Sequence, residues 1–218
     1  MAMVKICGVT DVDTARIAGE AGADWVGVVF HPKSPRYVNG PLAGDIAAAC
    51  SPAKAVALLV DPDNLMAEEL PKIGFRILQL HGNETPERVA EIKADLMRYE
   101  PTLGRPIRLW KAFGVSTRDD LRQAGDYAMA DNLLLDAKPP RGADRTGGHG
   151  VAFDWSILSD WKPKKSWLLA GGLNPENVAD AIQQTGAPAV DVSSGVESAP
   201  GVKDPAKIVD FIKAAKAA

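Results

Sequence analysis

The sequence predicts a (β/α)8 TIM barrel, and three observations lead to it. Eight short apolar runs alternate with eight helical stretches from one end of the chain to the other. These runs are mostly apolar, as is typical of strands that are buried on both faces of a parallel sheet. Eight such pairs in 218 residues match the size of a compact barrel. A doubly wound open sheet is the alternative, but it seldom needs eight strands at such regular spacing.

The expected strands are short, apolar and rich in β-branched residues, which fits buried positions in a sheet. In chain order they are Val4–Cys7, Trp25–Phe30, Ala55–Val60, Arg76–Leu80, Ile107–Ala112, Asn132–Asp136, Trp167–Ala170 and Ala189–Val192.

The expected helices lie between these strands and are rich in alanine, a strong helix former. In chain order they are Asp11–Ala21, Gly44–Cys50, Leu65–Ile73, Pro86–Ala94, Thr117–Ala124, Trp155–Ser159, Pro175–Gly186 and Pro205–Ala217. The segment Arg98–Arg105 is expected to be a surface connection before the fifth strand. No linker or change in composition divides the chain, so we expect one domain over residues 1–218.

The last third of the chain holds two turns that each follow an apolar strand directly. They are Gly171-Gly172 after the seventh strand and Ser193-Ser194-Gly195 after the eighth. Asn174-Pro175 and Asp204-Pro205 follow, and Asn or Asp before Pro is typical of a helix start. Unpaired N–H groups at helix ends bind anions, and glycine lets the backbone approach a ligand closely. The pair of turns therefore predicts a phosphate site and an enzyme for a phosphorylated small molecule.

Composition narrows the class of protein further. Hydrophobic residues make up 46% of the chain, enough for a substantial core, and the net charge of −3 disfavours nucleic acid or an anionic membrane as a partner. The first residues are too mixed for a signal peptide, and no apolar stretch approaches the roughly 20 residues of a membrane-spanning helix. Two cysteines do not form a secreted disulfide framework. We expect a cytoplasmic protein.

In a barrel of this kind, the reactive residues lie where the strands end, because the loops after the strands build one face. Cys7 ends the first strand and Asp136 the sixth. A thiol near cations could lose its proton and act as a base or nucleophile, and a partly desolvated carboxyl could donate a proton. The alternatives are a small core residue at Cys7 and a loop cap at Asp136. Cys50 lies at the opposite face, about 15 Å away, so no disulfide with Cys7 is expected.

Three further side chains at this face could contact a ligand. Asp191 lies inside the eighth strand, where it could bind backbone N–H groups, a cation or the substrate. Arg36 follows a proline-containing loop and could hold a carboxylate through two hydrogen bonds or simply be solvated. His81 could bond to its loop or contact a ligand. The histidines do not have the spacing of a metal site, and no Walker or dinucleotide motif is present, so no metal is expected.

The segments around these residues make the chain resemble the phosphoribosylanthranilate isomerase family of tryptophan biosynthesis. The matching segments occur in order along nearly the whole chain. They are Lys5-Ile6-Cys7-Gly8, Phe30-His31-Pro32-Lys33-Ser34-Pro35-Arg36-Tyr37-Val38, Gln79-Leu80-His81-Gly82, Leu134-Leu135-Asp136, Phe153-Asp154-Trp155, Leu169-Ala170-Gly171-Gly172-Leu173-Asn174-Pro175-Glu176-Asn177 and Asp191-Val192-Ser193-Ser194-Gly195-Val196-Glu197.

The resemblance implies an Amadori rearrangement of N-(5-phosphoribosyl)anthranilate to 1-(2-carboxyphenylamino)-1-deoxyribulose 5-phosphate, without a metal or organic cofactor. It implies that Asp136 protonates the furanose ring oxygen and that Cys7, as a thiolate, takes the proton from C2′. Asp136 must then stay protonated near neutral pH, and Cys7 needs a lowered pKa. Arg36 would hold the anthranilate carboxylate, with Asp191 and His81 beside the substrate. The phosphate would be held by Gly171, Gly172, Ser193, Ser194 and Gly195.

One segment departs from the family pattern. Many relatives carry a short Gly-Thr-Gly-type segment after the sixth strand, whereas this chain has residues 138–150 with several prolines, glycines and cations. This composition suggests a lid over an anionic substrate.

Two other functions remain as alternatives. A sibling isomerase acting on a phosphoribosyl-aminoimidazole carboxamide has a similar barrel, but it resembles a two-fold repeat with aspartate in the position of Cys7. A non-catalytic phosphate-binding barrel would keep the two turns but would not need Cys7, Asp136 and Arg36 together. The expected partner is therefore the phosphoribosylated anthranilate, with no nucleic acid or membrane. Separately, we expect the protein to be a monomer.

Overall fold

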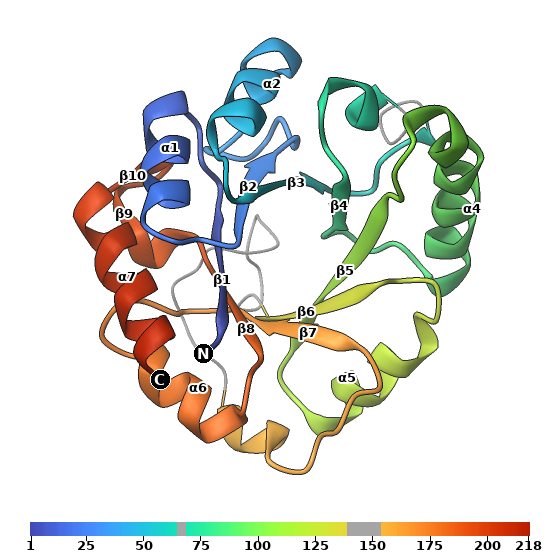
Figure 1. Ribbon diagram of the computed structural model, residues 1–218. Coiled ribbons are helices and arrows are strands. Elements are labelled where there is room, and N and C mark those ends of the chain that lie inside the picture. Colours follow the sequence, from blue (N-terminus) through green and yellow to red (C-terminus); the bar gives the residue numbers. More distant parts are fainter. Residues whose placement is uncertain (65–68, 139–153) are drawn as a thin grey trace.

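Eight parallel strands close into a barrel in the computed structural model, which describes residues 1–64, 69–138 and 154–218 (Figure 1). The predicted fold class is confirmed. Each strand pairs with the next one along the chain, and β1 also pairs with β8, which closes the barrel. The strands are β1 (Met3–Cys7), β2 (Trp25–Val29), β3 (Lys54–Leu59), β4 (Ile77–Leu80), β5 (Arg108–Val115), β6 (Asn132–Ala137), β7 (Ser166–Leu169) and β8 (Ala189–Val192).

Strand β5 is the one strand whose predicted end was wrong by more than a residue. It was expected to end at Ala112 but continues to Val115, because Gly114 and Val115 pair with Asp136 and Ala137 of β6. Pairing with β6 thus carries β5 past Gly114, although its pairing with β4 stops at Lys111. The extension places Asp136 within a paired part of the barrel wall.

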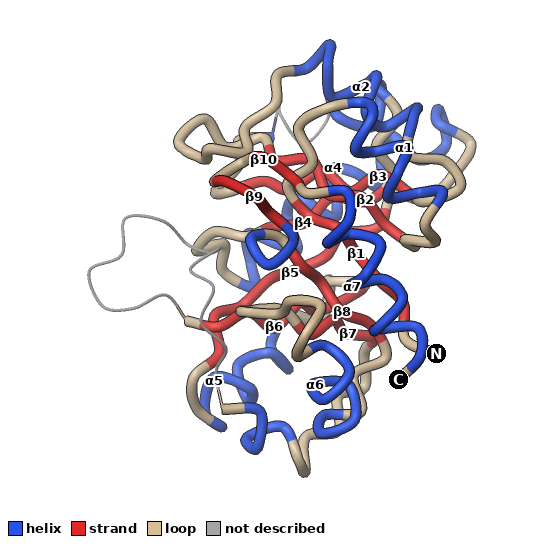
Figure 2. Tube along the Cα trace, turned by 90° about the vertical axis from the view of Figure 1, so that its left-hand side faces the viewer, coloured by secondary structure: helices blue, strands red, loops and turns tan. Residues whose placement is uncertain are grey.

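The helices surround the barrel (Figures 1 and 2). They are α1 (Val12–Glu20), α2 (Gly40–Ala49), α4 (Pro86–Leu103), α5 (Arg118–Gln123), α6 (Val178–Thr185) and α7 (Pro205–Ala217). Short 3₁₀ turns add η1 (Leu70–Ile73), η2 (Ala124–Asp126), η3 (Trp155–Leu158) and η4 (Ser194–Val196). The predicted helix Leu65–Ile73 falls partly outside the described residues, and its described end is η1. No helix in the described ranges is long and apolar enough to cross a membrane.

Helix α4 corrects the expected surface connection Arg98–Arg105. The helix continues through Pro101 to Leu103 and ends at Gly104, which has a left-handed backbone conformation. Its buried residues, Val89, Ile92 and Leu96, follow helical spacing. Proline near the end of a helix affects only the last turns, so this apolar face keeps the helix intact past the point where the sequence suggested a loop.

The segment after β8 also differs from the prediction. Between the eighth strand and α7, the chain forms a small antiparallel pair, β9 (Glu197–Ala199) and β10 (Val202–Lys203). The turn Ser193-Ser194-Gly195 leads into the short η4 and this hairpin instead of a longer helix. Asp204 then begins α7 as expected, since its side chain accepts the N–H groups of Ala206 and Lys207.

The start of α6 agrees with its predicted capping chemistry but lies later in the chain. Asn174 Oδ1 accepts the N–H groups of Glu176 (2.9 Å) and Asn177 (3.0 Å), so the residue caps a turn. The α-helix itself begins three residues after Pro175, at Val178.

Apolar side chains fill the barrel interior toward the amino ends of the strands. Trp25, which begins β2, packs edge-on against Trp110 of β5 with ring centroids 5.2 Å apart. The other members of this interior cluster are Val56, Ile77, Ala112, Leu134, Leu168, Ala170 and Ala189. The space toward the carboxyl ends of the strands remains for polar side chains. The loops that follow the strands surround this end of the barrel.

Candidate active site

Cys7, Asp136 and Asp191 all lie at the carboxyl ends of barrel strands, as the sequence predicted. Cys7 ends β1, Asp136 is the penultimate residue of β6 and Asp191 lies near the end of β8. All three side chains are buried. The barrel therefore gathers a thiol and two carboxyl groups on the face that carries active sites in this fold.

Lys5 is the nearest cation to Cys7 and was missed in the sequence. Its side chain is fully buried, and its Nζ lies 2.8 Å from Asp191 Oδ1. Lys5 and Cys7 are two residues apart on β1, so they point to the same side of the strand. A lysine between Val4 and Ile6 in an otherwise apolar strand is the signal that could have identified it.

Burial has the largest effect on the pKa of Cys7 in this site. Desolvation raises the pKa of the thiol above its ordinary value, and the negative charge of Asp191 adds to that effect. The Lys5 ammonium opposes both, with a smaller contribution from Lys203. The lowered pKa expected for Cys7 is therefore wrong for this structure, because burial outweighs the nearby cations.

Arg36 is buried and ion-paired, so it is not the solvated loop residue that was one interpretation of the sequence. Its Nε donates to Glu197 Oε1 at 2.6 Å and its Nη2 to Glu197 Oε2 at 2.9 Å. Lys203 Nζ donates to the same Glu197 Oε1 at 2.8 Å and to the carbonyl of Ser193 at 2.9 Å. The hairpin β9–β10, which the sequence did not reveal, supplies Glu197 and Lys203 and fixes the guanidinium.

The Arg36 side chain also borders Cys7 and the turn after β8. A methyl group added to Gly8 would overlap Arg36 Cδ and would lie 3.2 Å from Ser193 Oγ. The backbone next to Cys7, the guanidinium and the serine turn are therefore neighbours. Burial lowers the pKa of Lys203 here, although Glu197 opposes this effect.

Asp136 contacts His81, which the sequence had placed at the same face. His81 Nε2 lies 3.3 Å from Asp136 Oδ2, and Asp136 Oδ1 accepts the N–H of Ala137 at 2.8 Å. The other ring nitrogen, His81 Nδ1, lies 3.1 Å from Gln79 Nε2. Gln79 is fully buried and was not singled out in the sequence. His81 is thus held between the amide of Gln79 and the carboxyl of Asp136.

The two glycine- and serine-rich turns lie against each other. A methyl group added to Gly195 would overlap the carbonyl oxygen of Leu173, which belongs to the turn after β7. Gly171 has a φ of +86° and its Cα faces the backbone of Ala137, so a side chain would not fit there. Among the described residues, the N–H groups of Gly171 and Gly172 donate to no backbone carbonyl, and those of Ser194 and Gly195 donate to none outside η4. Converging unpaired amides of this kind bind anions.

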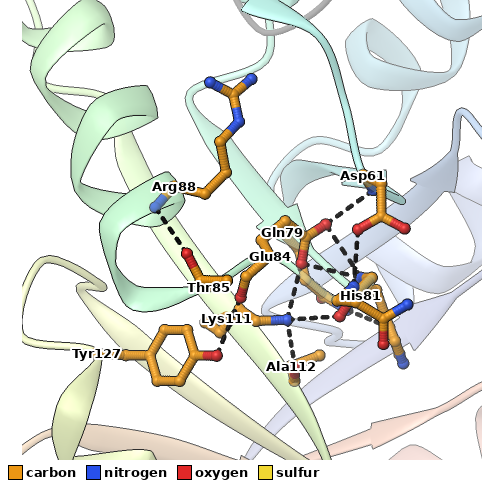
Figure 3. Close-up of polar contacts among 11 residues, drawn as sticks. Asp61, Gln79, His81, Glu84, Thr85, Arg88, Lys111, Ala112 and Tyr127 are labelled. Atoms are coloured by element: carbon orange, nitrogen blue, oxygen red, sulfur yellow. Dashed lines mark hydrogen bonds and ion pairs between the residues drawn. The ribbon is translucent and has the colours of Figure 1, made fainter.

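A second buried ion pair lies near the site but on the other side of the barrel wall (Figure 3). Lys111 Nζ lies 2.8 Å from Glu84 Oε2 and also donates to the carbonyls of Gly82 and Ala112. Glu84 accepts the N–H groups of Asp61 and Gly82 (Figure 3). Lys111 alternates with the interior residues Trp110 and Ala112 along β5, so it faces the helices. This pair ties together the loops after β3 and β4.

Much of the loop expected to act as a lid lies outside the described residues. Residues 139–153, including His149, belong to this part of the chain. Its described start, Lys138, donates to Asp120 at 2.6 Å.

Comparison with known proteins now places the chain. The family model described as "N-(5'phosphoribosyl)anthranilate (PRA) isomerase" matches residues 4–214. The chain belongs to the N-(5'-phosphoribosyl)anthranilate isomerase family. The family resemblance of the sequence motifs is therefore confirmed.

Individual family members cover the whole chain. The N-(5'-phosphoribosyl)anthranilate isomerase of Hyphomonas neptunium is 54% identical over 217 residues, which cover 100% of this chain and 98% of that protein. Among solved structures, phosphoribosyl anthranilate isomerase from Thermotoga maritima is 38% identical with a TM-score of 0.86 over the full length of both chains. Another solved isomerase, 36% identical with a TM-score of 0.83 over both full lengths, is in complex with reduced 1-(o-carboxyphenylamino)-1-deoxyribulose 5-phosphate.

Proposed function

We propose that this isomerase-family chain converts N-(5-phosphoribosyl)anthranilate to 1-(2-carboxyphenylamino)-1-deoxyribulose 5-phosphate in tryptophan biosynthesis, with Asp136 as the general acid and Cys7 as the general base. The observation that carries this proposal is the placement of Cys7 and Asp136 on one barrel face, together with Arg36 and the paired turns. Membership of the family supports the activity, and the solved relative bound to a reduced product supports the class of ligand.

Asp136 performs the first step. Its carboxyl group gives a proton to the furanose ring oxygen while the bond between that oxygen and C1′ breaks. The anilinic nitrogen lone pair forms a C1′=N bond, which leaves a protonated Schiff base and the Asp136 carboxylate. His81 and the Ala137 N–H hold the carboxyl group in place for this transfer.

Cys7 performs the second step. The thiolate takes the proton from C2′, the C–H electrons form the C1′=C2′ bond and the nitrogen regains its lone pair. The resulting enolamine then tautomerises to the ketone. The cationic Schiff base is an opposite charge beside Cys7, so its formation favours the thiolate that burial alone disfavours.

The two ends of the substrate are anionic and have separate binding groups in this proposal. Nη1 of Arg36, the guanidinium nitrogen that Glu197 does not bind, meets the anthranilate carboxylate. Asp191 and His81 border the sugar between the two ends. The phosphate is bound by the turn residues Gly171, Gly172, Ser193, Ser194 and Gly195.

The assay that tests the activity generates phosphoribosylanthranilate in the reaction vessel and follows the loss of its anthranilate-type fluorescence. We expect turnover that depends on this chain and needs no added metal or cofactor. Absence of turnover with active substrate-generating enzymes would refute the proposed activity.

We further propose that one domain, residues 1–218, acts as a monomer in the cytoplasm. All proposed site residues come from one chain and one barrel, and both cysteines are free and buried, as suits a reducing compartment. Light scattering of the purified protein measures the oligomeric state.

A further inference from the structure

We propose that Lys5 is a positioning residue that sets the ionisation of Cys7 in concert with Asp191, so that the three side chains work as one unit. The inference rests on the proposed role of Cys7 as the base, and it assigns a function to the most deeply buried cation in the described part of the barrel.

The position of Lys5 is the first observation. Its side chain has no exposed surface. It lies in the interior of the barrel, on the same side of β1 as Cys7. A lysine is almost never fully buried unless it is paired. Its partner Asp191 lies on β8, directly across the strand pair that closes the barrel, where Lys5 and Asp191 are in register.

The second observation is the contact of Lys5 and Cys7 with one glycine. A methyl group added to Gly27 of β2 would lie 2.9 Å from Cys7 Sγ and 3.1 Å from Lys5 Nζ. The sulfur and the ammonium therefore occupy the same space above Gly27, which a side chain would fill. Cys7 and Gly27 are also in register between β1 and β2.

The third observation is the balance of charges around the sulfur. Among the described residues, the charged groups around Cys7 are Lys5 on its own strand, Asp191 on β8, Lys203 from β10 and the Arg36 guanidinium, which borders the backbone next to Cys7; β2 presents Gly27 at this point. Lys5 lowers the pKa of Cys7, Asp191 raises it and Lys203 lowers it by a smaller amount. Burial lowers the pKa of Lys5 itself, but Asp191 and Cys7 outweigh that effect, so Lys5 stays charged.

These charges predict opposite responses to the removal of either partner. Without Lys5, the thiolate loses its nearest cation and keeps a nearby carboxylate, so ionisation of Cys7 moves to higher pH. Without the charge of Asp191, the Cys7 thiolate is the remaining anion that holds the buried Lys5 ammonium, so the two form an ion pair and ionisation of Cys7 moves to lower pH. A purely structural role of the ion pair would give no such opposition of sign.

The experiment measures the ultraviolet absorbance of the Cys7 thiolate as a function of pH. It uses the full chain with Cys50→Ser, and the profile of the Cys7→Ser variant is subtracted to remove tyrosine ionisation. Lys5→Met should lower the thiolate fraction at a fixed pH by about tenfold or more, equivalent to at least one pKa unit, and Asp191→Asn should raise it. The acidic limb of the pH profile of kcat/KM should accordingly move to higher pH in Lys5→Met and to lower pH in Asp191→Asn.

Lys111→Met is the matched control. It also removes a buried lysine from a barrel strand and breaks an ion pair of 2.8 Å, but Lys111 faces the helices. This variant should lose stability and leave the titration of Cys7 in place. If Lys5→Met does not fold, the double variant Lys5→Met with Asp191→Asn decides, because it removes both charges of the buried pair and should titrate at higher pH than Asp191→Asn alone; equal titration of these two variants would overturn the inference.

The inference is overturned if Lys5→Met titrates like Lys111→Met, or if Lys5→Met and Asp191→Asn move the profile in the same direction. The absorbance reports the thiol whether or not the protein turns over its substrate. Absence of isomerase activity in the unmodified chain would therefore contradict the proposed function, while the effect of Lys5 and Asp191 on the titration of Cys7 could still be measured.

Discussion

On the β1–β8 side of the barrel mouth, Cys7 shares its surroundings with a buried ammonium and a carboxylate, whereas on the β4–β6 side Asp136 contacts a histidine that an amide holds in place. No lysine or arginine pairs with Asp136 among the described residues. A nearby buried cation favours the deprotonated form of an acidic group, which a base needs. The absence of such a cation favours the protonated form, which an acid needs. The two sides thus suit opposite proton-transfer tasks on one face.

The largest expected effect comes from Cys7→Ser. A hydroxyl is far less acidic than a thiol and stays protonated, so kcat should fall by on the order of 10³-fold or more. The matched control is Cys50→Ser, which changes the other buried thiol, bonded to the carbonyls of Ala47 and Ala53. Steady-state kinetics of both variants are compared. If Cys7→Ser keeps a large share of kcat, Cys7 is a packing residue and the β1–β8 side has no catalytic base.

Asp136→Asn tests the other side of the comparison. The amide keeps the shape of the carboxyl group but cannot deliver a proton, so kcat should fall by about 10²–10⁴-fold while a product analogue still binds. Both quantities are measured on the same preparation.

Asp131→Asn is the control for Asp136→Asn, because Asp131 directly precedes β6, at the end of the strand opposite to Asp136. Backbone and side-chain hydrogen bonds from Leu109 and Lys93 lower its pKa although burial opposes them. A lowered folded-state pKa contributes stability above the unfolded pKa that is lost as pH falls, so this variant should be less stable at neutral pH with kcat nearly unchanged. Loss of analogue binding with kcat retained in Asp136→Asn would instead make Asp136 a binding residue.

The smallest expected effect is that of Arg36→Met, and it falls on binding. Loss of this charge-assisted contact should weaken binding of a carboxylate-bearing product analogue by about 10–100-fold, because a hydrogen bond to a charged group contributes about 1.5–3 kcal/mol. Competition by inorganic phosphate should change little, because the turn amides are untouched. Equal weakening of both ligands would mean that Arg36, with Glu197 and Lys203, acts on the fold of the whole β1–β8 side.

The barrel and the strand ends that carry the proposed site could be predicted from local patterns in the sequence. Uninterrupted apolar runs predict buried parallel strands, and a polar residue at the end of such a run, as at Cys7 and Asp136, is a local signal. The turn residues Gly171 and Gly195 are local signals as well, because backbone conformation and close approach restrict which residues can stand there.

Which charged side chains pair with each other could not be predicted in this way, because the partners lie far apart in the sequence. Lys5 and Asp191 are 186 residues apart, and they pair because β1 closes onto β8. Arg36 and Glu197 are 161 residues apart, and they pair because the hairpin after β8 packs against the loop after β2. The burial that raises the pKa of Cys7 is likewise a property of the closed barrel. Local patterns record which way a side chain points along its own strand, but the partner it meets and the solvent it loses depend on elements from the far end of the chain.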